Sequence, residues 1–486
     1  MSGLFSYSDR ITLEGLEELL KNGIKIASEI YISIKLLFQE ESIMTRVDNS
    51  VQELLELDKK YFLHPTSPIK QQQDQGPSFI FIEGKGITLT DIVGNTVIDG
   101  MSSLWNVNVG HGRDELGKVA MEQMSKLAFS SCFATFSNEP AIRLAAKLAQ
   151  IAPGNLTATF FTSGGSEAND TAYKLARHYW ILKGQPNRKK IISRTKSYHG
   201  VAMGSTNATG LKPFREFTNS FDPDFCYADH FSTEDLRRVI EAEGPETIAA
   251  FIAEPVQGAG GLHVPPDDYF KEVRSICDEY GFLFITDEVI TGFGRTGKYF
   301  GIEHYGVSPD MMCFAKGITS GYAQLGGVMI SENIHQDLME LSTGTLLHGY
   351  TYSGHPMACA VALKNIELIE QEGLIVNAEK MGKEMLKDFQ WIQGECRIVG
   401  KVKGLGLMGG LELVKDRKTN ESFESPVAPL VVTEAAKRGL ICRSVIFDGQ
   451  DTVVFAPPLI INKEEIEKMI DILHEAVAAV EAAVLQ

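Results

Sequence analysis

The sequence lacks the patterns that mark a disulfide-stapled or metal-binding protein. Its seven cysteines, at positions 132, 226, 277, 313, 359, 396 and 442, include no C-x-x-C pair. Such an odd, scattered set is typical of free thiols in a reducing compartment. No H-E-x-x-H motif and no cluster of cysteine and histidine with metal-ligand spacing occurs. We therefore expect no metal site.

Basic charge and long apolar runs are also scarce. Lysine and arginine total 46 against 63 aspartate and glutamate, a formal net charge of −17. This argues against nucleic-acid binding, because a phosphate-tracking surface needs a basic excess. The apolar stretch 24–38 is interrupted by Lys25, Glu29 and Lys35, which makes it too polar to span a bilayer. It also lacks the basic start and cleavage site of a signal peptide, so we expect no membrane partner and a cytoplasmic location.

What is present is the pattern of a multidomain α/β protein. At 486 residues the chain is too long for one compact core. Between residues 100 and 356, apolar runs alternate with helical stretches such as 167–182, which predicts a large domain with a mostly parallel sheet covered by helices. The predicted strands of this domain are 158–162, 190–193, 248–253, 283–286 and 312–315.

Both ends of the chain are predicted to form a smaller α+β domain, from residues 44–99 and 357–486. The strands 79–82, 87–91 and 96–99, separated by glycine-containing turns, predict an antiparallel meander. A helix over 358–371, a strand pair over 404–412 and 452–455, and a terminal helix from Lys463 complete the prediction. Residues 1–43, helical over 11–42, form an N-terminal extension of unknown role, and Met44 is an alternative start.

Two groups follow predicted strands, at the sheet edge where open α/β folds bind ligands. Gly164, Gly165 and Ser166 open a helix directly after one strand, so their backbone N–H groups can bind an anion; a plain helix cap is the alternative. Glu254 ends another strand, just before Pro255-Val-Gln-Gly-Ala-Gly260.

Two further strand ends carry an acid and an amine. Asp287 follows the buried run 281–286, and its carboxylate needs either a pyridinium N–H or an ion pair with Arg295. Lys316 follows an apolar run, so desolvation can lower its pKa and free the amine to form a Schiff base. The four groups together fit a ligand with a phosphate, a ring nitrogen and an aldehyde. Pyridoxal 5′-phosphate (PLP) has all three.

Longer stretches of the sequence resemble the class III (subgroup II) aminotransferases of PLP fold type I. The resemblance covers residues 58–480, and Lys316 follows Asp287 at the family's spacing of 29 residues. The matching stretches are Ser163-Gly-Gly-Ser-Glu-Ala-Asn-Asp170, Ser197-Tyr-His-Gly200, Phe284-Ile-Thr-Asp-Glu-Val-Ile-Thr-Gly-Phe-Gly-Arg-Thr-Gly297, Phe314-Ala-Lys-Gly317 and His348-Gly-Tyr-Thr-Tyr-Ser-Gly-His-Pro356.

The resemblance implies roles for single residues. Lys316 carries the Schiff base and moves the proton, and Asp287 keeps the pyridine nitrogen protonated. Tyr198 and Val289 enclose the ring, and Glu254 belongs to the cofactor site.

The resemblance also implies how the phosphate is bound. Gly165 and Ser166 bind it, while Thr351 donates to the phosphate of the neighbouring subunit, which makes a homodimer the minimum unit; a tetramer stays open. Many relatives have Gly-Ser-Gly where this chain has Ser163-Gly164-Gly165. One side-chain hydroxyl has therefore moved, and which serine or backbone groups contact the phosphate stays open.

Substrate residues place the chain among the ω-amino acid and amine:pyruvate aminotransferases. The ornithine and γ-aminobutyrate branches pair the substrate arginine with a glutamate, where this chain has Ala259. Arg443 would therefore be free to bind a keto-acid carboxylate. Trp105 resembles the pocket tryptophan of the branch, and ordinary core packing is the alternative. The implied activity is ping-pong transfer of an amino group to pyruvate.

Other activities stay open at this point. The same pattern serves aminomutases, racemases and decarboxylating aminotransferases. A non-catalytic, PLP-binding regulatory protein is a further alternative, although the N-terminal segment does not resemble a DNA-binding domain.

Overall fold

The computed structural model describes residues 50–219 and 221–485, which form two compact units. The smaller unit comprises residues up to Ile82 together with Thr90–Asn95, and the larger comprises Glu83–Leu89 and the chain from Thr96 onward. In the smaller unit, residues 50–61 are helical and α3 (Ile69–Gln75) follows. The extension predicted for residues 1–43 lies outside the described residues. The predicted division into a large and a small domain stays a prediction.

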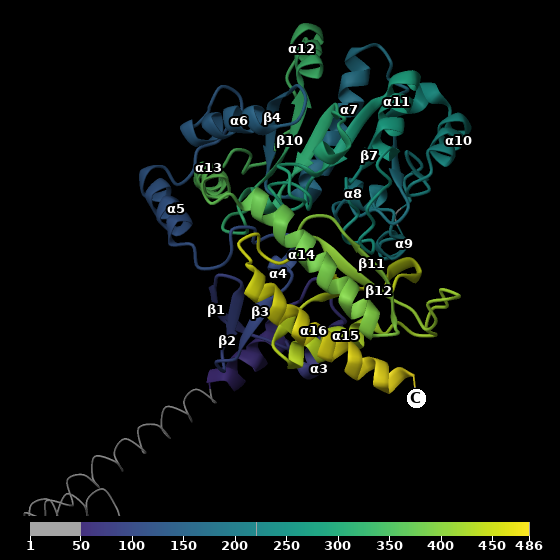
Figure 1. The fold of residues 1–486 in the computed structure, drawn as a ribbon. Helices are drawn as coiled ribbons and strands as arrows, with labels where there is room; N and C mark the ends of the chain where they lie inside the picture. The colour runs from purple at the N-terminus through teal and green to yellow at the C-terminus, as the bar shows by residue number, and fades with distance from the viewer. Residues whose placement is uncertain (1–49, 220, 486) are drawn as a thin grey trace, which may run out of the picture. The chain divides into compact units, whose positions relative to one another are not determined.

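A seven-stranded sheet forms the centre of the larger unit (Figure 1), in the order β4-β10-β9-β8-β7-β5-β6. All neighbouring strands are parallel except β10, which is antiparallel to β4 and to β9. The strands are β4 (Leu156–Thr162), β5 (Lys190–Arg194), β6 (Phe225–Ala228), β7 (Ile248–Ala253), β8 (Leu283–Asp287), β9 (Met311–Phe314) and β10 (Gly326–Ser331). The predicted α/β architecture is confirmed, and β6 and β10 are additional to the predicted strands.

Both faces of this sheet are covered, which explains why its strands are apolar throughout. Every residue of β7 is buried, and its side chains divide between two clusters, since Phe251 belongs to one and Ile252 to the other. The helix α7 (Gly165–Leu182) contributes Ala172 and Leu175 to the second cluster. The remaining helices of this region are α4 (Ser102–Trp105), α5 (Asp114–Lys126), α6 (Glu139–Ile151), α8 (Met203–Ala208), α9 (Lys212–Glu216), α10 (Thr233–Glu243), α11 (Tyr269–Tyr280), α12 (Glu332–Leu341) and α13 (Pro356–Gln371).

A second, antiparallel sheet has the order β11-β12-β15-β14. Its strands are β11 (Val399–Gly404), β12 (Gly409–Leu413), β14 (Arg443–Val445) and β15 (Thr452–Phe455), and α14 (Leu374–Glu395), α15 (Ala428–Lys437) and α16 (Lys463–Val484) accompany them. The prediction of one strand over 404–412 is wrong, because a turn at 405–408, with Gly406 at φ 57°, separates β11 from β12. The terminal helix begins at Lys463 as predicted, after a capping box of Asn462 and Glu465.

The predicted meander is represented by β1 (Phe81–Lys85), β2 (Thr88–Asp91) and β3 (Thr96–Asp99). The first predicted strand, 79–82, is displaced, because the chain stays extended through Gly84 and turns at Gly86, where φ is 58°. A Cβ at Gly84 would lie 2.9 Å from His111, so that glycine serves a close approach of a side chain. The strand β3 also pairs in parallel with β13 (Leu440–Ile441).

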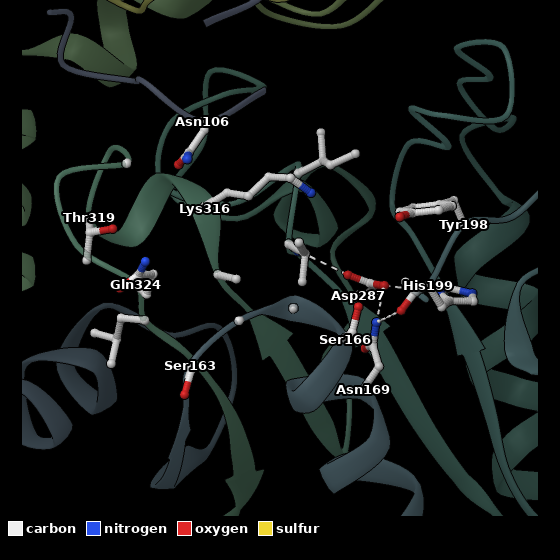
Figure 2. A pocket seen from close by; sticks show the side chains of 18 of the residues that line it. Asn106, Ser163, Ser166, Asn169, Tyr198, His199, Asp287, Lys316, Thr319 and Gln324 are labelled. Atoms are coloured by element: carbon white, nitrogen blue, oxygen red, sulfur yellow. Dashed lines mark hydrogen bonds and ion pairs between the residues drawn. The ribbon is translucent and has the colours of Figure 1, made fainter. Parts of the chain in front are cut away.

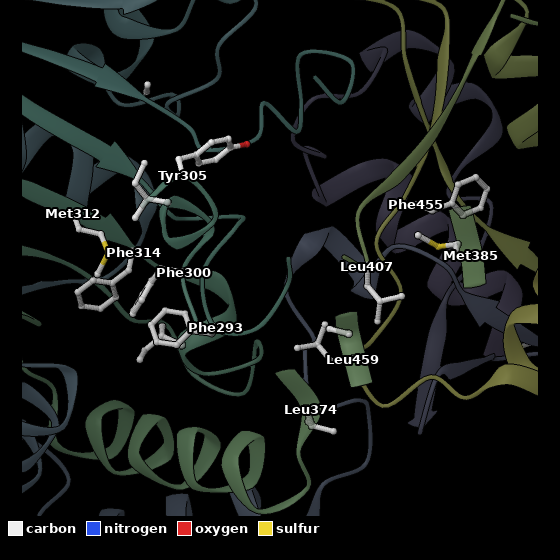
Figure 3. Close-up of a cluster of buried hydrophobic side chains, with 14 of the residues drawn as sticks. Phe293, Phe300, Tyr305, Met312, Phe314, Leu374, Met385, Leu407, Phe455 and Leu459 are labelled. Atoms are coloured by element: carbon white, nitrogen blue, oxygen red, sulfur yellow. The ribbon is translucent and has the colours of Figure 1, made fainter. Parts of the chain in front are cut away.

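One connected apolar core joins the seven-stranded sheet to the β11-β12-β15-β14 sheet (Figure 3). It extends from Phe314 in β9, through Phe293 and Leu459, to Leu407 and Phe455 in the second sheet region. Val445 of β14 belongs to a separate apolar cluster, together with Val256 and Ile290, which follow β7 and β8. No helix among the described residues is long and apolar enough to cross a membrane.

Candidate active site

A cavity of about 270 Å³ lies at the carboxyl ends of the central strands. The loops after β4, β5, β7, β8 and β9 each contribute to its wall (Figure 2). Eight of the predicted site residues line it, namely Gly164, Gly165, Ser166, Tyr198, Glu254, Asp287, Val289 and Lys316. Residues as far apart in sequence as Gly164 and Lys316 therefore meet at one site, as expected for an open α/β sheet.

Lys316 follows β9 with a backbone φ of 47°, in a region that non-glycine residues rarely occupy. Its Nζ has no hydrogen-bond or ion-pair partner within residues 50–219 and 221–485. Burial lowers the pKa of Lys316 to about 8, while Asp287 and Glu254 act to raise it and Arg443 acts to lower it. A lysine of this kind is partly neutral near pH 7, and the neutral amine is the form that attacks a carbonyl carbon.

Asp287 is buried at the end of β8, and three donors hold its carboxylate (Figure 2). Asn169 Nδ2 donates to Oδ2 at 2.8 Å, His199 Nδ1 lies 2.8 Å from the same oxygen, and the N–H of Val289 donates to Oδ1 at 3.0 Å. Because Oδ2 is engaged twice and Oδ1 once, Oδ1 retains capacity for a further donor on the cavity side.

Asn169 and His199 were not predicted as site residues, although both occur in the stretches that resemble the family. Asn169 lies one turn into α7, and its amide also donates to the backbone oxygen of His199 at 2.7 Å. Their place in the matching stretches 163–170 and 197–200 was the available signal.

The alternative of an ion pair between Asp287 and Arg295 is wrong. The guanidinium of Arg295 is fully buried elsewhere, where it donates to Ser102 Oγ at 3.0 Å and Asn108 Oδ1 at 2.8 Å, and to the backbone oxygens of Leu407 and Pro457. It joins segments of the chain around the apolar core and leaves Asp287 to the cavity.

The start of α7 forms a cradle for an anion. Gly164 caps the helix without a side-chain hydrogen bond, so first-turn N–H groups stay available. Ser166 Oγ accepts the N–H of Val201 at 3.1 Å, which leaves the hydroxyl proton of Ser166 free to donate. Gly165 packs against Val289, since a Cβ at Gly165 would lie 2.8 Å from Val289 Cγ1.

The two glycines of this cradle should respond differently to substitution. We expect Gly165→Ala to weaken PLP binding by at least ~10-fold, because its new methyl group must displace Val289, and such overpacking costs about 1–3 kcal/mol. Gly164→Ala is the matched control: Gly164 is extended, with φ −177°, and its Cβ would meet nothing within 4 Å. Titration of each apoprotein with PLP checks this. Equal losses in both variants would contradict the packing of Gly165 on Val289.

The remaining cavity residues include two with altered acidity. Tyr198 lines the wall, its ring 5.4 Å from that of Phe214, and burial raises its pKa. Glu254 follows β7, and burial raises its pKa to about 7.

Three predicted site residues do not line this cavity. Trp105 is 2% exposed and packs in an apolar cluster with Val256 and Ile290, which matches the alternative of ordinary core packing. Thr351 is exposed. Arg443, the first residue of β14, is half-buried, and its charge acts on the pKa values of Lys316 and Tyr198.

The cavity fits PLP group by group. The start of α7 offers donors for a phosphate, Asp287 Oδ1 offers an acceptor for a ring N–H, and Lys316 offers an amine for the aldehyde. Within the described residues, no cluster of three or more His, Cys, Asp or Glu is arranged to hold a metal ion.

Known proteins resemble this chain over most of its length. The family model for aminotransferase class-III matches residues 69–477. The putrescine–pyruvate aminotransferase of Pseudomonas aeruginosa is 39% identical over an alignment of 450 residues, and the match covers 88% of this chain and 96% of that protein. A solved transaminase from the marine bacterium Virgibacillus is 53% identical, with a TM-score of 0.88, and the match covers 89% of this chain and 100% of that one.

A further solved structure connects the fold to the cofactor. The ω-transaminase from Pseudomonas jessenii in complex with PMP is 36% identical, with a TM-score of 0.85, over 89% of this chain and 99% of that one. These matches span the strands and loops that build the cavity. The chain belongs to the class-III aminotransferases, and it is a PLP-dependent transaminase of fold type I.

Proposed function

We propose that this transaminase moves an amino group from an amine or ω-amino acid to pyruvate, forming alanine, in a ping-pong reaction. The observation that carries the acceptor is Arg443, a half-buried guanidinium close enough to act on the pKa of Lys316. Within residues 50–219 and 221–485 it has no ion-pair partner. A relative named for putrescine and pyruvate and solved ω-transaminases support the substrate class.

Each cavity residue then has a task. PLP, when bound, supplies a carbonyl carbon for the amine and a ring that accepts electrons. Lys316 Nζ would hold the cofactor, give way to the donor amine, and carry the proton removed from the donor's Cα. Asp287 would keep the ring nitrogen protonated, and Tyr198 and Val289 would enclose the ring and exclude water.

A donor panel tests the proposed reaction. Purified holoenzyme is incubated with pyruvate and a series of amines (ω-amino acids, diamines and aryl-alkyl amines), and alanine is measured. We expect alanine in proportion to the carbonyl product. Loss of CO₂ would point to the decarboxylating branch, and racemisation without a keto acid or migration of the amino group would point to a racemase or an aminomutase. Binding of PLP without any turnover would point to a regulatory protein.

Arg443→Ala should weaken pyruvate and alanine binding by ~100-fold or more, about 2.7 kcal/mol, because a guanidinium grips a carboxylate with two hydrogen bonds. The half-reaction with the uncharged amine 1-phenylethylamine should change little. Arg443→Lys keeps the positive charge but loses the two-pronged hydrogen bonding of a guanidinium, so its effect on pyruvate and alanine binding should be intermediate. Single-turnover kinetics measures the two half-reactions separately. Equal effects on the two half-reactions would contradict a carboxylate-binding role.

We further propose that the active form is a homodimer in which Thr351 reaches the partner's cofactor phosphate. Thr351 is exposed, and large apolar side chains around it are exposed too: Leu347 is 94%, Tyr352 58% and Phe133 48% exposed. Phe133 lies close to the segment that carries Thr351, because a Cβ at Gly349 would lie 2.7 Å from the Phe133 ring. An apolar patch of this kind is typical of an interaction surface.

Mixed dimers test the shared site. Thr351→Ala alone should raise the PLP dissociation constant ~10-fold, about the effect of one hydrogen bond to a charged group. In a hybrid of Lys316→Ala and Thr351→Ala subunits, a shared arrangement leaves one site with both native residues. Tight PLP binding and activity should therefore return at that site. If each site is built from one chain, the hybrid regains nothing.

We also infer a cytoplasmic location. All seven cysteines are free, and all but Cys132 are buried. Free thiols are typical of a reducing compartment. Fractionation of cells that express the full chain checks the location.

A further inference from the structure

Glu254 joins two loops of the cavity wall. Its Oε1 accepts the N–H of Tyr198 at 3.1 Å, and its Oε2 accepts the N–H of Gly258 at 3.4 Å. Tyr198 lies in the loop after β5 and Gly258 in the loop after β7, and these strands are parallel neighbours. A single carboxylate, 3% exposed, thus spans the gap between the loops.

Other contacts also hold the loops after β5 and β7 together, so Glu254 is one of several links between them. The guanidinium of Arg194 donates to the backbone oxygen of Glu254, and Gln257 Nε2 donates to the backbone oxygen of Thr195 at 2.9 Å. A Cβ at Gly260 would lie 1.8 Å from the backbone oxygen of Lys196, so the loops approach with no room for a side chain there. Among these contacts, only the side chain of Glu254 can gain or lose a proton near neutral pH.

We propose that Glu254 is a positioning residue whose ionised carboxylate fastens the Tyr198 loop to the loop after β7 and so holds Tyr198 in place on the cavity wall. A carboxylate accepts at both oxygens, whereas a protonated carboxyl group offers one good acceptor and one donor. Protonation therefore releases Tyr198 or Gly258. The two loops of the cavity wall are therefore held together when Glu254 is ionised and become more mobile when it is protonated.

The surroundings of Glu254 place this change near neutrality. Burial raises its pKa to about 7, His199 and Arg194 act to lower it, and Asp287 acts to raise it. Lys316 faces the same cavity, and its own pKa responds to Glu254.

Burial of the ionised carboxylate lowers the stability of the folded protein. Because the pKa is raised from the ordinary 4.5 to about 7, protonated Glu254 favours the folded state, and that stability is fully present below pH 4.5 and is lost as pH rises through about 7. Glu254→Gln should therefore melt no lower than wild type at alkaline pH.

Hydrogen–deuterium exchange of the holoenzyme, read by mass spectrometry, tests this link between the two loops, which we call the Glu254 clamp. In wild type, peptides that contain Tyr198 and Gly258 should exchange ~10-fold faster at about pH 5.5 than at about pH 8.5, after correction for intrinsic rates, because one charge-assisted hydrogen bond is lost. In Glu254→Gln, whose amide accepts at one atom only, exchange should be fast at both pH values. PLP release by gel filtration should follow the same pattern.

Glu288→Gln is the matched control. Glu288 is also buried with a pKa raised by burial to about 7, and it accepts the N–H groups of Gly301 and Ile302 at 2.8 Å, but it does not line the cavity. The pH dependence at Tyr198 and Gly258 should survive in this variant. Wild-type exchange that is flat across the pH range, or pH dependence that persists in Glu254→Gln, would overturn the proposal.

This inference depends on the proposed function only for the statement that Tyr198 faces the cofactor. Hydrogen exchange does not require turnover, so a failed donor panel and a failed clamp are distinguishable. If Glu254→Gln does not fold, the wild-type exchange profile still decides the outcome.

Discussion

Lys316→Ala should abolish amino transfer while leaving a folded protein that still binds PLP. Turnover is expected to fall by at least ~10⁴-fold, because one change removes both the nucleophile and the group that carries the proton. The physical basis is an amine with no partner within residues 50–219 and 221–485, whose pKa burial lowers to about 8, so that part of it is neutral near pH 7. Steady-state kinetics with saturating PLP measures the effect.

Lys316→Arg is the control for charge alone. It keeps a cation beside Asp287 but cannot condense with an aldehyde, so it should be as inactive as the alanine variant. Substantial activity in Lys316→Arg alone would show that Lys316 contributes only charge, and substantial activity in Lys316→Ala would show that the side chain is not required. In either case the assignment of the amine would fail.

Asp287→Asn is expected to have the next largest effect, a loss of ~10²–10³-fold in turnover, comparable to removing one preorganised electrostatic group. The amide preserves the size of the side chain but removes the anion that keeps a ring nitrogen protonated. Asp287→Glu should recover part of the activity. Turnover per bound PLP, measured beside the melting temperature, separates chemistry from folding.

Asp310→Asn is a matched control for Asp287. Asp310 accepts from Arg274 and from the N–H of Phe284 at the other end of the sheet, outside the cavity. Its substitution should lower stability without changing turnover per bound PLP. Near-wild-type activity in Asp287→Asn would instead make Asp287 a structural residue held by Asn169 and His199.

The strands that end at the site could be predicted because burial on both faces makes them continuous apolar runs. The run before Glu254 was predicted as 248–253, the bounds of β7. The strand β10 was missed because it begins with Gly326 and Gly327, and glycine is a poor strand former. The structure gives the reason: a Cβ at Gly327 would lie 2.6 Å from the Phe314 ring.

The site could be predicted where one residue at a strand end suffices, as for Asp287 and Lys316. It could not be predicted where side chains converge through tertiary packing. Nothing in local sequence indicates that Asn169 and His199 meet at Asp287 Oδ2. Likewise, the burial of Trp105 depends on the loops after β7 and β8, which pack against it.

The most direct test of the central claim is chemical. The holoenzyme is reduced with borohydride, which makes the bond between a lysine and PLP permanent, and it is then digested and mapped by mass spectrometry. We predict a single modified peptide with the cofactor on Lys316, and no modified peptide from Lys316→Ala. A cofactor found on any other lysine of the wild-type protein would contradict the account.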